Sequence, residues 1–118
     1  MYIDMGIINN DYGSDIRYYK RNRNKIEKIA YVGPVINGNL TRFISGYIWY
    51  LMKKHYILKS VLPEEHRDLL SDTYDELYML IINPIEEPLI VYEDLQVIED
   101  TINGIATEFQ VVIDEDNL

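Results

Sequence analysis

The stretch GPVINGNLT, residues 33–41, is the part of the sequence whose residue types and spacing come closest to a chemical motif. Gly33 and Gly38 have the G-x-x-x-x-G spacing of a phosphate-binding loop, and a helix is expected to follow them. Asn39 stands where that loop needs its lysine, and Leu40 where it needs the Ser or Thr that holds magnesium. Because no cation remains to bind the phosphates, we interpret the stretch as a connecting loop.

The cysteines and histidines give no catalytic or metal-binding pattern either. The chain has no cysteine, which excludes disulfides, thiolate metal ligands and a cysteine nucleophile. His66 follows Glu64 and Glu65, but neighbours one and two positions apart do not face each other on a helix, so we expect a surface histidine. His55 falls on the apolar face of an expected helix and is predicted to lie in the core or in an interface. We therefore expect no metal, no cofactor and no enzymatic activity.

The charged residues are divided unevenly along the chain. The formal net charge is −9, yet residues 1–62 hold ten of the eleven Lys and Arg. Residues 63–118 hold one base, Arg67, and sixteen of the twenty acids. A negatively charged surface repels nucleic acid and attracts basic partners. The sequence therefore predicts a basic protein partner and makes a nucleic-acid partner unlikely on electrostatic grounds.

The block RYYKRNRNK, residues 17–25, concentrates positive charge beside two adjacent tyrosines. One interpretation is that it faces carboxylates, either those of the C-terminal half or those of a second copy or a partner. The alternative is a nucleic-acid site in which phosphate contact is combined with base stacking. Its residues would be Arg17, Tyr18, Tyr19, Lys20, Arg21, Arg23 and Lys25. The negative net charge favours the first interpretation.

The pattern of short apolar runs predicts an α+β fold. Its expected strands are residues 2–8, 15–20 and 25–32, which form a short N-terminal antiparallel sheet or hairpin, and then residues 88–92 and 108–113. The segment from Arg17 to Ile29 would suit a basic helix equally well, so an all-α bundle is the alternative. No linker or repeat is visible, and 118 residues are the size of one domain, so we expect 1–118 to be a single globular domain.

Three helices are expected to pack on this sheet, at residues 41–58, 63–82 and 93–106. The first has an apolar face formed by Ile44, Ile48, Leu51, His55 and Leu58. Trp49, Tyr50 and Tyr56 fall outside that face, so the helix is either central or exposes an aromatic patch; we favour a central helix. A homodimer would be compatible with either arrangement of this helix. In the second helix the acids lie opposite a stripe that contains Leu70 and Leu77.

This acidic helix face is the candidate interaction site. Tyr and Trp are frequent anchors at protein interfaces, so the predicted partner-binding residues are Asp68, Asp72, Asp75, Glu76, Tyr78 and Trp49. A small, acidic, cysteine-free domain without a catalytic constellation resembles, in general character, bacterial toxin-immunity proteins and phage-encoded inhibitors of host nucleases; no motif specific to either family is present. The resemblance implies an inhibitor that blocks a basic surface, such as that of a nuclease, by charge and shape complementarity.

Two further classes of function stay open. The first is nucleic-acid binding through residues 17–25, and the second is a self-associating structural or viral subunit whose basic and acidic halves pair between copies. The longest near-apolar run, residues 43–52, is shorter than the roughly 20 residues that span a bilayer. The N-terminus lacks the features of a signal peptide, so we expect a cytoplasmic protein with no membrane association.

Overall fold

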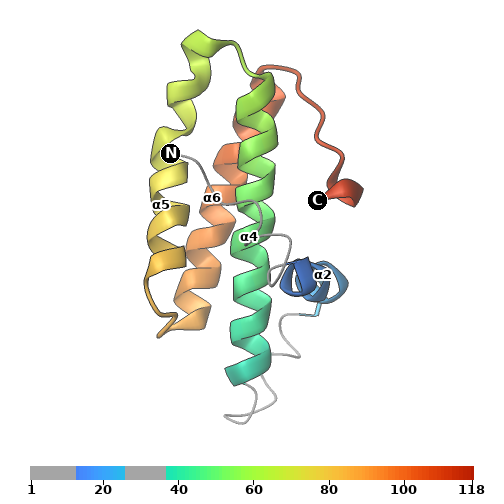
Figure 1. The fold of residues 1–118 in the computed structure, drawn as a ribbon, viewed down its shortest axis with the longest axis vertical. Helices are drawn as coiled ribbons and strands as arrows, with labels where there is room; N and C mark the ends of the chain where they lie inside the picture. Colours follow the sequence, from blue (N-terminus) through green and yellow to red (C-terminus); the bar gives the residue numbers. More distant parts are fainter. Residues whose placement is uncertain (1–12, 26–36) are drawn as a thin grey trace. The chain divides into compact units, whose positions relative to one another are not determined.

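The computed structural model describes residues 13–25 and 37–118, except for the side chains of residues 37–39. Its regular elements are all helical: α2 (Gly13–Asn22), α4 (Asn37–Val61), the 3-10 helix η3 (Glu64–Leu70), α5 (Ser71–Ile82), α6 (Pro88–Glu108) and the 3-10 helix η4 (Glu115–Asn117) (Figure 1). No residue of these two segments belongs to a β-strand. The structure therefore supports an all-α fold, and the α+β prediction is wrong.

The chain divides into two compact units, Met1–Trp49 and Tyr50–Leu118, and the division falls within α4. The N-terminal unit contains α2 and the first part of α4. The C-terminal unit contains the second part of α4 together with α5 and α6. The expectation that residues 1–118 form one globular domain stays a prediction.

Residues 15–20, expected to form a strand, lie in α2. Ile16 and Tyr19 are three positions apart and each is 2% exposed, which is the spacing of a buried helix face. Asp15 lies in the first turn, while Lys20 and Arg21 lie in the last turn, so their charges match the helix dipole. The strand expected at residues 2–8, and all but the first residue of the one expected at 25–32, lie outside the described residues.

The run PLIVY, residues 88–92, begins α6 and does not form a strand. Pro88 suits the first turn of a helix because its missing N–H would have no intrahelical partner there. Leu89 and Ile90 are both exposed, so the run is not buried on two faces as a central strand would be. A short apolar run has no periodicity that separates a strand from a helix, which explains the error.

The strand expected at residues 108–113 is replaced by the end of α6 and an extended segment. Gln110 has a φ of 56°, in the left-handed region. The Gln110 N–H donates to the Thr107 carbonyl at 3.1 Å, and the Val111 N–H donates to the Ala106 carbonyl at 2.8 Å. This pair of bonds is the Schellman motif, which satisfies the last carbonyls of a helix. It turns the chain out of α6 before η4.

The expected helices exist, with different boundaries. Helix α4 extends beyond the predicted residues 41–58 at both ends, so that Gly38, Asn39 and Leu40 are already helical. Its predicted apolar face is buried. Trp49 and Tyr50 are buried as well, as expected for a central helix, whereas Tyr56 is 57% exposed and departs from that expectation. The predicted helix 63–82 is divided into η3 and α5, and the predicted helix 93–106 is the greater part of α6.

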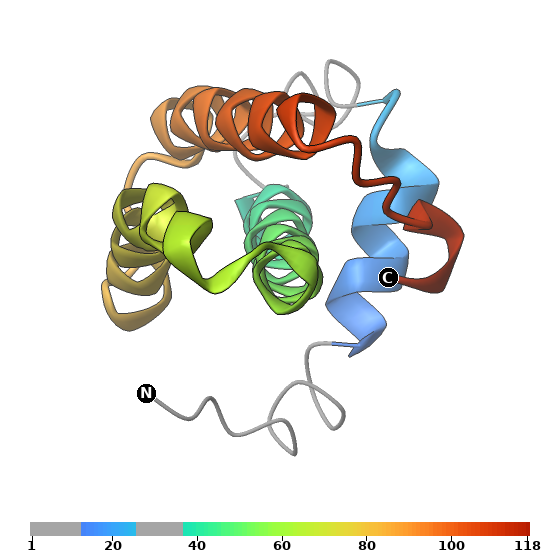
Figure 2. The same cartoon turned by 90° about the horizontal axis from the view of Figure 1, so that it is seen from above.

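In the C-terminal unit, α5 and α6 form an antiparallel pair beside the second part of α4 (Figure 1, Figure 2). The core side chains of this unit include Leu58, Leu70, Leu77, Leu95, Ile98 and Ile102, each at most 2% exposed. Leu77 comes from α5, and Leu95, Ile98 and Ile102 come from α6, where their spacing of three and four residues forms one buried stripe. Among the helices formed by residues 13–25 and 37–118, none combines the length and apolar character needed to cross a membrane.

In the N-terminal unit, α2 crosses the first part of α4 at Gly46. A Cβ added at Gly46 would overlap the Asp15 carbonyl and lie 2.8 Å from the Tyr19 Cβ. The Tyr19 ring stacks on the Tyr47 ring, with centroids 4.5 Å apart. Beside this stack, the Asp15 carboxylate accepts hydrogen bonds from Arg42 Nε at 3.3 Å and from Ser45 Oγ at 3.2 Å. The two helices are thus joined by a close backbone approach, an aromatic stack and a shared carboxylate.

Candidate functional site: an acidic groove between α5 and α6

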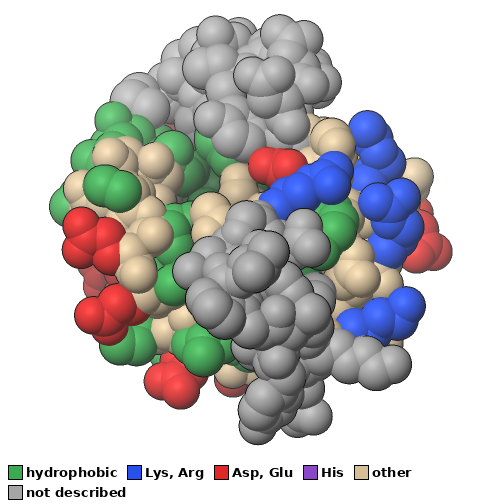
Figure 3. Space-filling model, turned by 90° about the horizontal axis from the view of Figure 1, so that it is seen from below, with side chains coloured by type: hydrophobic (Ala, Val, Ile, Leu, Met, Phe, Trp, Pro, Cys, Tyr) green, Lys and Arg blue, Asp and Glu red, His purple; other side chains and the backbone are tan. Residues whose placement is uncertain are grey.

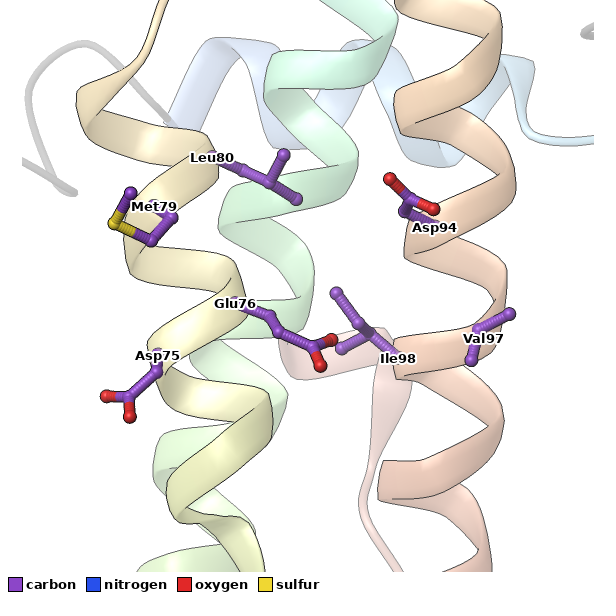
Figure 4. A pocket seen from close by; sticks show the side chains of 7 residues that line it. All are labelled: Asp75, Glu76, Met79, Leu80, Asp94, Val97 and Ile98. Atoms are coloured by element: carbon purple, nitrogen blue, oxygen red, sulfur yellow. The ribbon is translucent and has the colours of Figure 1, made fainter.

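A groove of about 570 Å³ lies between α5 and α6. Its lining consists of Asp75, Glu76, Met79 and Leu80 from α5, and Asp94, Val97 and Ile98 from α6 (Figure 4). The lining combines four apolar side chains with three carboxylates. Met79 is 51% exposed and Val97 is 64% exposed, so apolar surface is open to solvent beside the charges.

Helical periodicity places these residues on the outer face of the pair. On α5, the exposed side chains of Asp72, Asp75, Glu76 and Met79 follow the spacing i, i+3, i+4, i+7, which is one stripe of a helix. On α6, exposed Asp94 and Val97 lie beside the core residue Ile98 in the same way. The core residues on the other face hold each helix in this orientation, so the groove is a consequence of core packing.

Acidic and apolar side chains alternate across the groove. Figure 4 shows Glu76 and Ile98 pointing toward each other from opposite helices, while Leu80 and Asp94 lie across from each other farther along the groove. This pairing follows from the antiparallel course of the helices, since Glu76 to Leu80 is one turn of α5 and Asp94 to Ile98 is one turn of α6. Leu80 and Ile98 form the apolar floor, with one carboxylate opposite each of them.

No cation of the C-terminal unit neutralises the groove. The ion pairs formed there are Lys54–Glu115 at 2.7 Å and His66–Glu65 at 3.6 Å, among the residues that the structure describes. Arg67 Nε donates to the Leu62 carbonyl at 3.3 Å, and this hydrogen bond holds its side chain near the start of η3. Glu76 and Asp94 point into the groove, and Asp75 lies at its α5 edge and points outward (Figure 4). Three carboxylates so close together, without a base among them, produce a negative potential that attracts cations.

The structure brings only part of the predicted interaction site together. Asp75 and Glu76 line the groove, and Asp72 is exposed on the same stripe of α5. Asp68 is exposed in η3 and is not part of the groove lining. Tyr78 is partly buried and stacks on Tyr74, with ring centroids 6.2 Å apart.

Trp49 does not line the groove. It is 6% exposed and is the last residue of the N-terminal unit, whereas the predicted acids and Tyr78 belong to the C-terminal unit. The role of all six residues in binding a partner stays a prediction.

Sequence reasoning missed Asp94, Met79 and Val97. The signal for the two apolar residues was present, since each lies off the core stripe of its helix and next to acids. An apolar side chain at such a position is exposed when the helix buries its stripe. That Asp94 faces Leu80 depends on the register between α5 and α6, which no single-helix pattern contains.

A second polar group lies in the core of the C-terminal unit. His55 Nε2 is 3.2 Å from the Leu70 carbonyl, which also accepts a hydrogen bond from Thr73 Oγ1 at 2.9 Å. Burial lowers the pKa of His55, and the nearby Lys59 lowers it further, although the contact with the Leu70 carbonyl opposes this shift. The Tyr74 ring centroid lies 5.4 Å from that of His55, and burial raises the pKa of its hydroxyl. This group joins α4 to the start of α5 and is structural, as predicted for His55.

His66 is partly exposed, near the surface as predicted. Its ring packs on Phe109, with centroids 4.8 Å apart. In the described ranges, no cluster of three or more His, Cys, Asp or Glu side chains is arranged to hold a metal ion.

The basic block 17–25 lies on α2 and its C-terminal turn. Arg17, Arg21 and Lys25 are exposed, and Lys and Arg side chains gather on part of the surface shown in Figure 3. Tyr19 is buried against Tyr47, and the Arg42 guanidinium lies 4.6 Å from the centroid of the Tyr18 ring. Tyr19 is therefore not available for base stacking, and binding of nucleic acid through the block stays a prediction. Pairing of the block with the C-terminal carboxylates would join the two units and stays a prediction.

Comparisons of the chain with protein-family models, with curated proteins and with solved structures find no match. The function is therefore inferred from the groove itself.

Proposed function

We propose that this chain is a protein-binding inhibitor that uses the groove between α5 and α6 to dock on a basic surface of another protein. The type of function is that of toxin-immunity or phage counter-defence proteins, which block an enzyme without performing chemistry. The observation that carries the proposal is the exposed apolar surface of Met79 and Val97 beside the carboxylates of Asp75, Glu76 and Asp94, which form no ion pair with any residue that the structure describes.

The combination of apolar and acidic surface favours a protein over a small ion as the partner. Apolar anchors supply affinity when they are buried, and charges around them supply specificity and a fast association rate. Nucleases and other enzymes that act on nucleic acid present basic clefts. An acidic ligand in such a cleft would exclude the nucleic acid, which would inhibit the enzyme without any catalytic residue in the inhibitor.

A symmetric homodimer through the groove is disfavoured by the same charges. A two-fold contact places the same patch on both copies, so Asp75, Glu76 and Asp94 of one copy would face the same carboxylates of the other. Like charges placed together cost several kcal/mol at an interface. A basic partner removes that repulsion.

The test is capture and inhibition. The wild-type chain is used as bait in an extract of the source cell, next to a Glu76→Gln/Asp94→Asn variant and a control variant, Glu64→Gln/Glu108→Gln, with the same charge change. Glu64 and Glu108 are exposed and do not line the groove. We expect a basic protein on the wild type and the control, but not on the groove variant, and we expect its purified activity to fall when the chain is added. Failure to retain such a protein, or full activity of the captured protein in complex, would refute the proposal.

A further inference from the structure

We infer that the segment which the groove accepts is a basic amphipathic α-helix, lying along α5 and α6 with its apolar residues on Leu80 and Ile98. The inference rests on the proposed function, since it specifies which part of a basic partner the groove binds. Three features of the groove carry it: the state of its backbone groups, the shape of its floor and the position of its charges.

The backbone of the groove offers an extended peptide no row of free N–H and C=O groups. All seven lining residues lie inside α5 or α6. Their backbone groups are bonded along the helix, except for the Leu80 carbonyl, whose fourth neighbour Pro84 has no N–H. The described residues contain no strand edge to which a peptide strand could add. An occupant must therefore satisfy its own backbone polar groups when it leaves water, and a helix does so internally.

The shape of the floor also fits a helix. Two adjacent helices leave a furrow between them, and a third helix packs into such a furrow by inserting side chains spaced three or four residues apart. Asp75 to Leu80 on α5 extends over about 7.5 Å at 1.5 Å per residue. This length accommodates two successive apolar side chains of the occupant, one on Leu80 and one on Ile98, with exposed Met79 and Val97 at their sides.

The carboxylates specify where the positive charges of the occupant must be. Glu76 lies on the α5 side at one level of the groove, and Asp94 lies on the α6 side about one turn farther along (Figure 4). An occupying helix would thus need one Lys or Arg on each flank of its apolar stripe, about one turn apart. These flanks correspond to the e and g positions of a coiled coil, where charge sets partner choice and orientation. Asp75, next to Glu76, strengthens the α5 side.

The probe is a synthetic amphipathic peptide of about 18 residues, made of leucine on one face and lysine on both flanks. It is compared with a peptide of the same composition except for one central proline, which breaks the helix but keeps the charge. A third peptide has glutamate in place of lysine. Binding is measured by fluorescence anisotropy at about 50 mM and about 300 mM salt, and helix formation is measured by circular dichroism.

We expect the lysine helix to bind at least about tenfold more tightly than either comparison peptide, with helix formation on binding. The Glu76→Gln/Asp94→Asn variant should lose about tenfold in affinity for it. The Glu64→Gln/Glu108→Gln variant should bind as the wild type does. Unchanged circular dichroism of the free variants shows that the fold is intact.

Four results would overturn the inference. Equal binding of the proline peptide would mean that charge alone is recognised, and equal binding of the glutamate peptide would mean that apolar contact alone is recognised. The absence of peptide binding would also reject a helical occupant. If a captured partner is nevertheless inhibited in a manner that depends on Glu76 and Asp94, the proposed function stands and only the helix is rejected. Self-association of the wild-type chain in sedimentation, lost in the groove variant, would identify a second copy as the occupant and overturn the inference.

Discussion

Substitution of Gly46 by alanine should destabilise the N-terminal unit, because this glycine lies where α2 and α4 meet. The new methyl group would overlap the Asp15 carbonyl, which is backbone, and lie 2.8 Å from the Tyr19 Cβ. A backbone carbonyl cannot rotate away as a side chain can, so α2 must move. Inserting a methylene into a packed core costs about 1–3 kcal/mol, and displacing the Tyr19–Tyr47 stack adds about 0.5–1.5 kcal/mol.

A gain in helix propensity opposes this loss. Alanine is favoured over glycine by about 1 kcal/mol in a helix interior. The net effect expected for Gly46→Ala is therefore a loss of about 1–3 kcal/mol. Gly104 provides the matched control, since it is an exposed residue in α6 and a Cβ there would meet nothing within 4 Å. Gly104→Ala should stabilise the protein by about 1 kcal/mol.

Urea unfolding of the two variants and the wild type, followed by circular dichroism and tyrosine fluorescence, measures both effects. We expect the transition of Gly46→Ala to move to lower urea and that of Gly104→Ala to move to higher urea. Because the same substitution is made in two helices, a difference in stability between the two variants cannot come from helix propensity. A Gly46→Ala variant as stable as the wild type would show that α2 does not approach α4 in this way.

Three further outcomes are expected from urea unfolding. The Lys54 ammonium is nearly buried, with 4% of its side chain exposed, and its partner Glu115 is 45% exposed. Glu115→Gln should therefore lower the free energy of unfolding by about 1–3 kcal/mol, and adding Lys54→Met should restore much of this loss. A double variant less stable than Glu115→Gln would contradict a stabilising ion pair. Burial lowers the pKa of His55, so the unfolded state binds a proton at this residue more readily, and stability should fall as pH decreases from about 7 to about 5. If His55→Gln shows the same dependence of stability on pH, that dependence comes from other groups. Glu76→Gln/Asp94→Asn should be as stable as the wild type or more so, because like charges are removed, and a loss above about 1 kcal/mol would mean that these carboxylates hold the fold together.

The sequence predicted a helix more reliably when its apolar spacing was repeated over more turns. Helix α4 and the greater part of α6 were predicted because apolar spacing of three and four residues persists over several turns. The error at residues 15–20 arose because a six-residue segment with adjacent tyrosines fits a strand and a helix equally well. Ile16 and Tyr19 reveal the helix only through their burial, which depends on tertiary packing that a local pattern does not contain.

The candidate site could be predicted only on one side. The acids of α5 lie opposite its core stripe, so Asp75 and Glu76 were identified from spacing alone. Asp94 was not identified, because its place opposite Leu80 is set by the antiparallel register between α5 and α6. The exposed Met79 and Val97 show that off-stripe apolar residues among acids are a usable signal for a groove of this kind.

The association rate of the captured partner, measured by stopped flow as a function of salt, tests the role of the groove most directly. Electrostatic steering predicts a rate that falls steeply as salt increases, since charges are screened beyond about 8 Å at physiological ionic strength. The Glu76→Gln/Asp94→Asn variant should associate more slowly at low salt and show a weaker salt dependence, while Glu64→Gln/Glu108→Gln should keep a slope closer to that of the wild type. A rate that is insensitive to salt, or equal slopes for the two variants, would contradict the proposal that this groove recognises a basic partner.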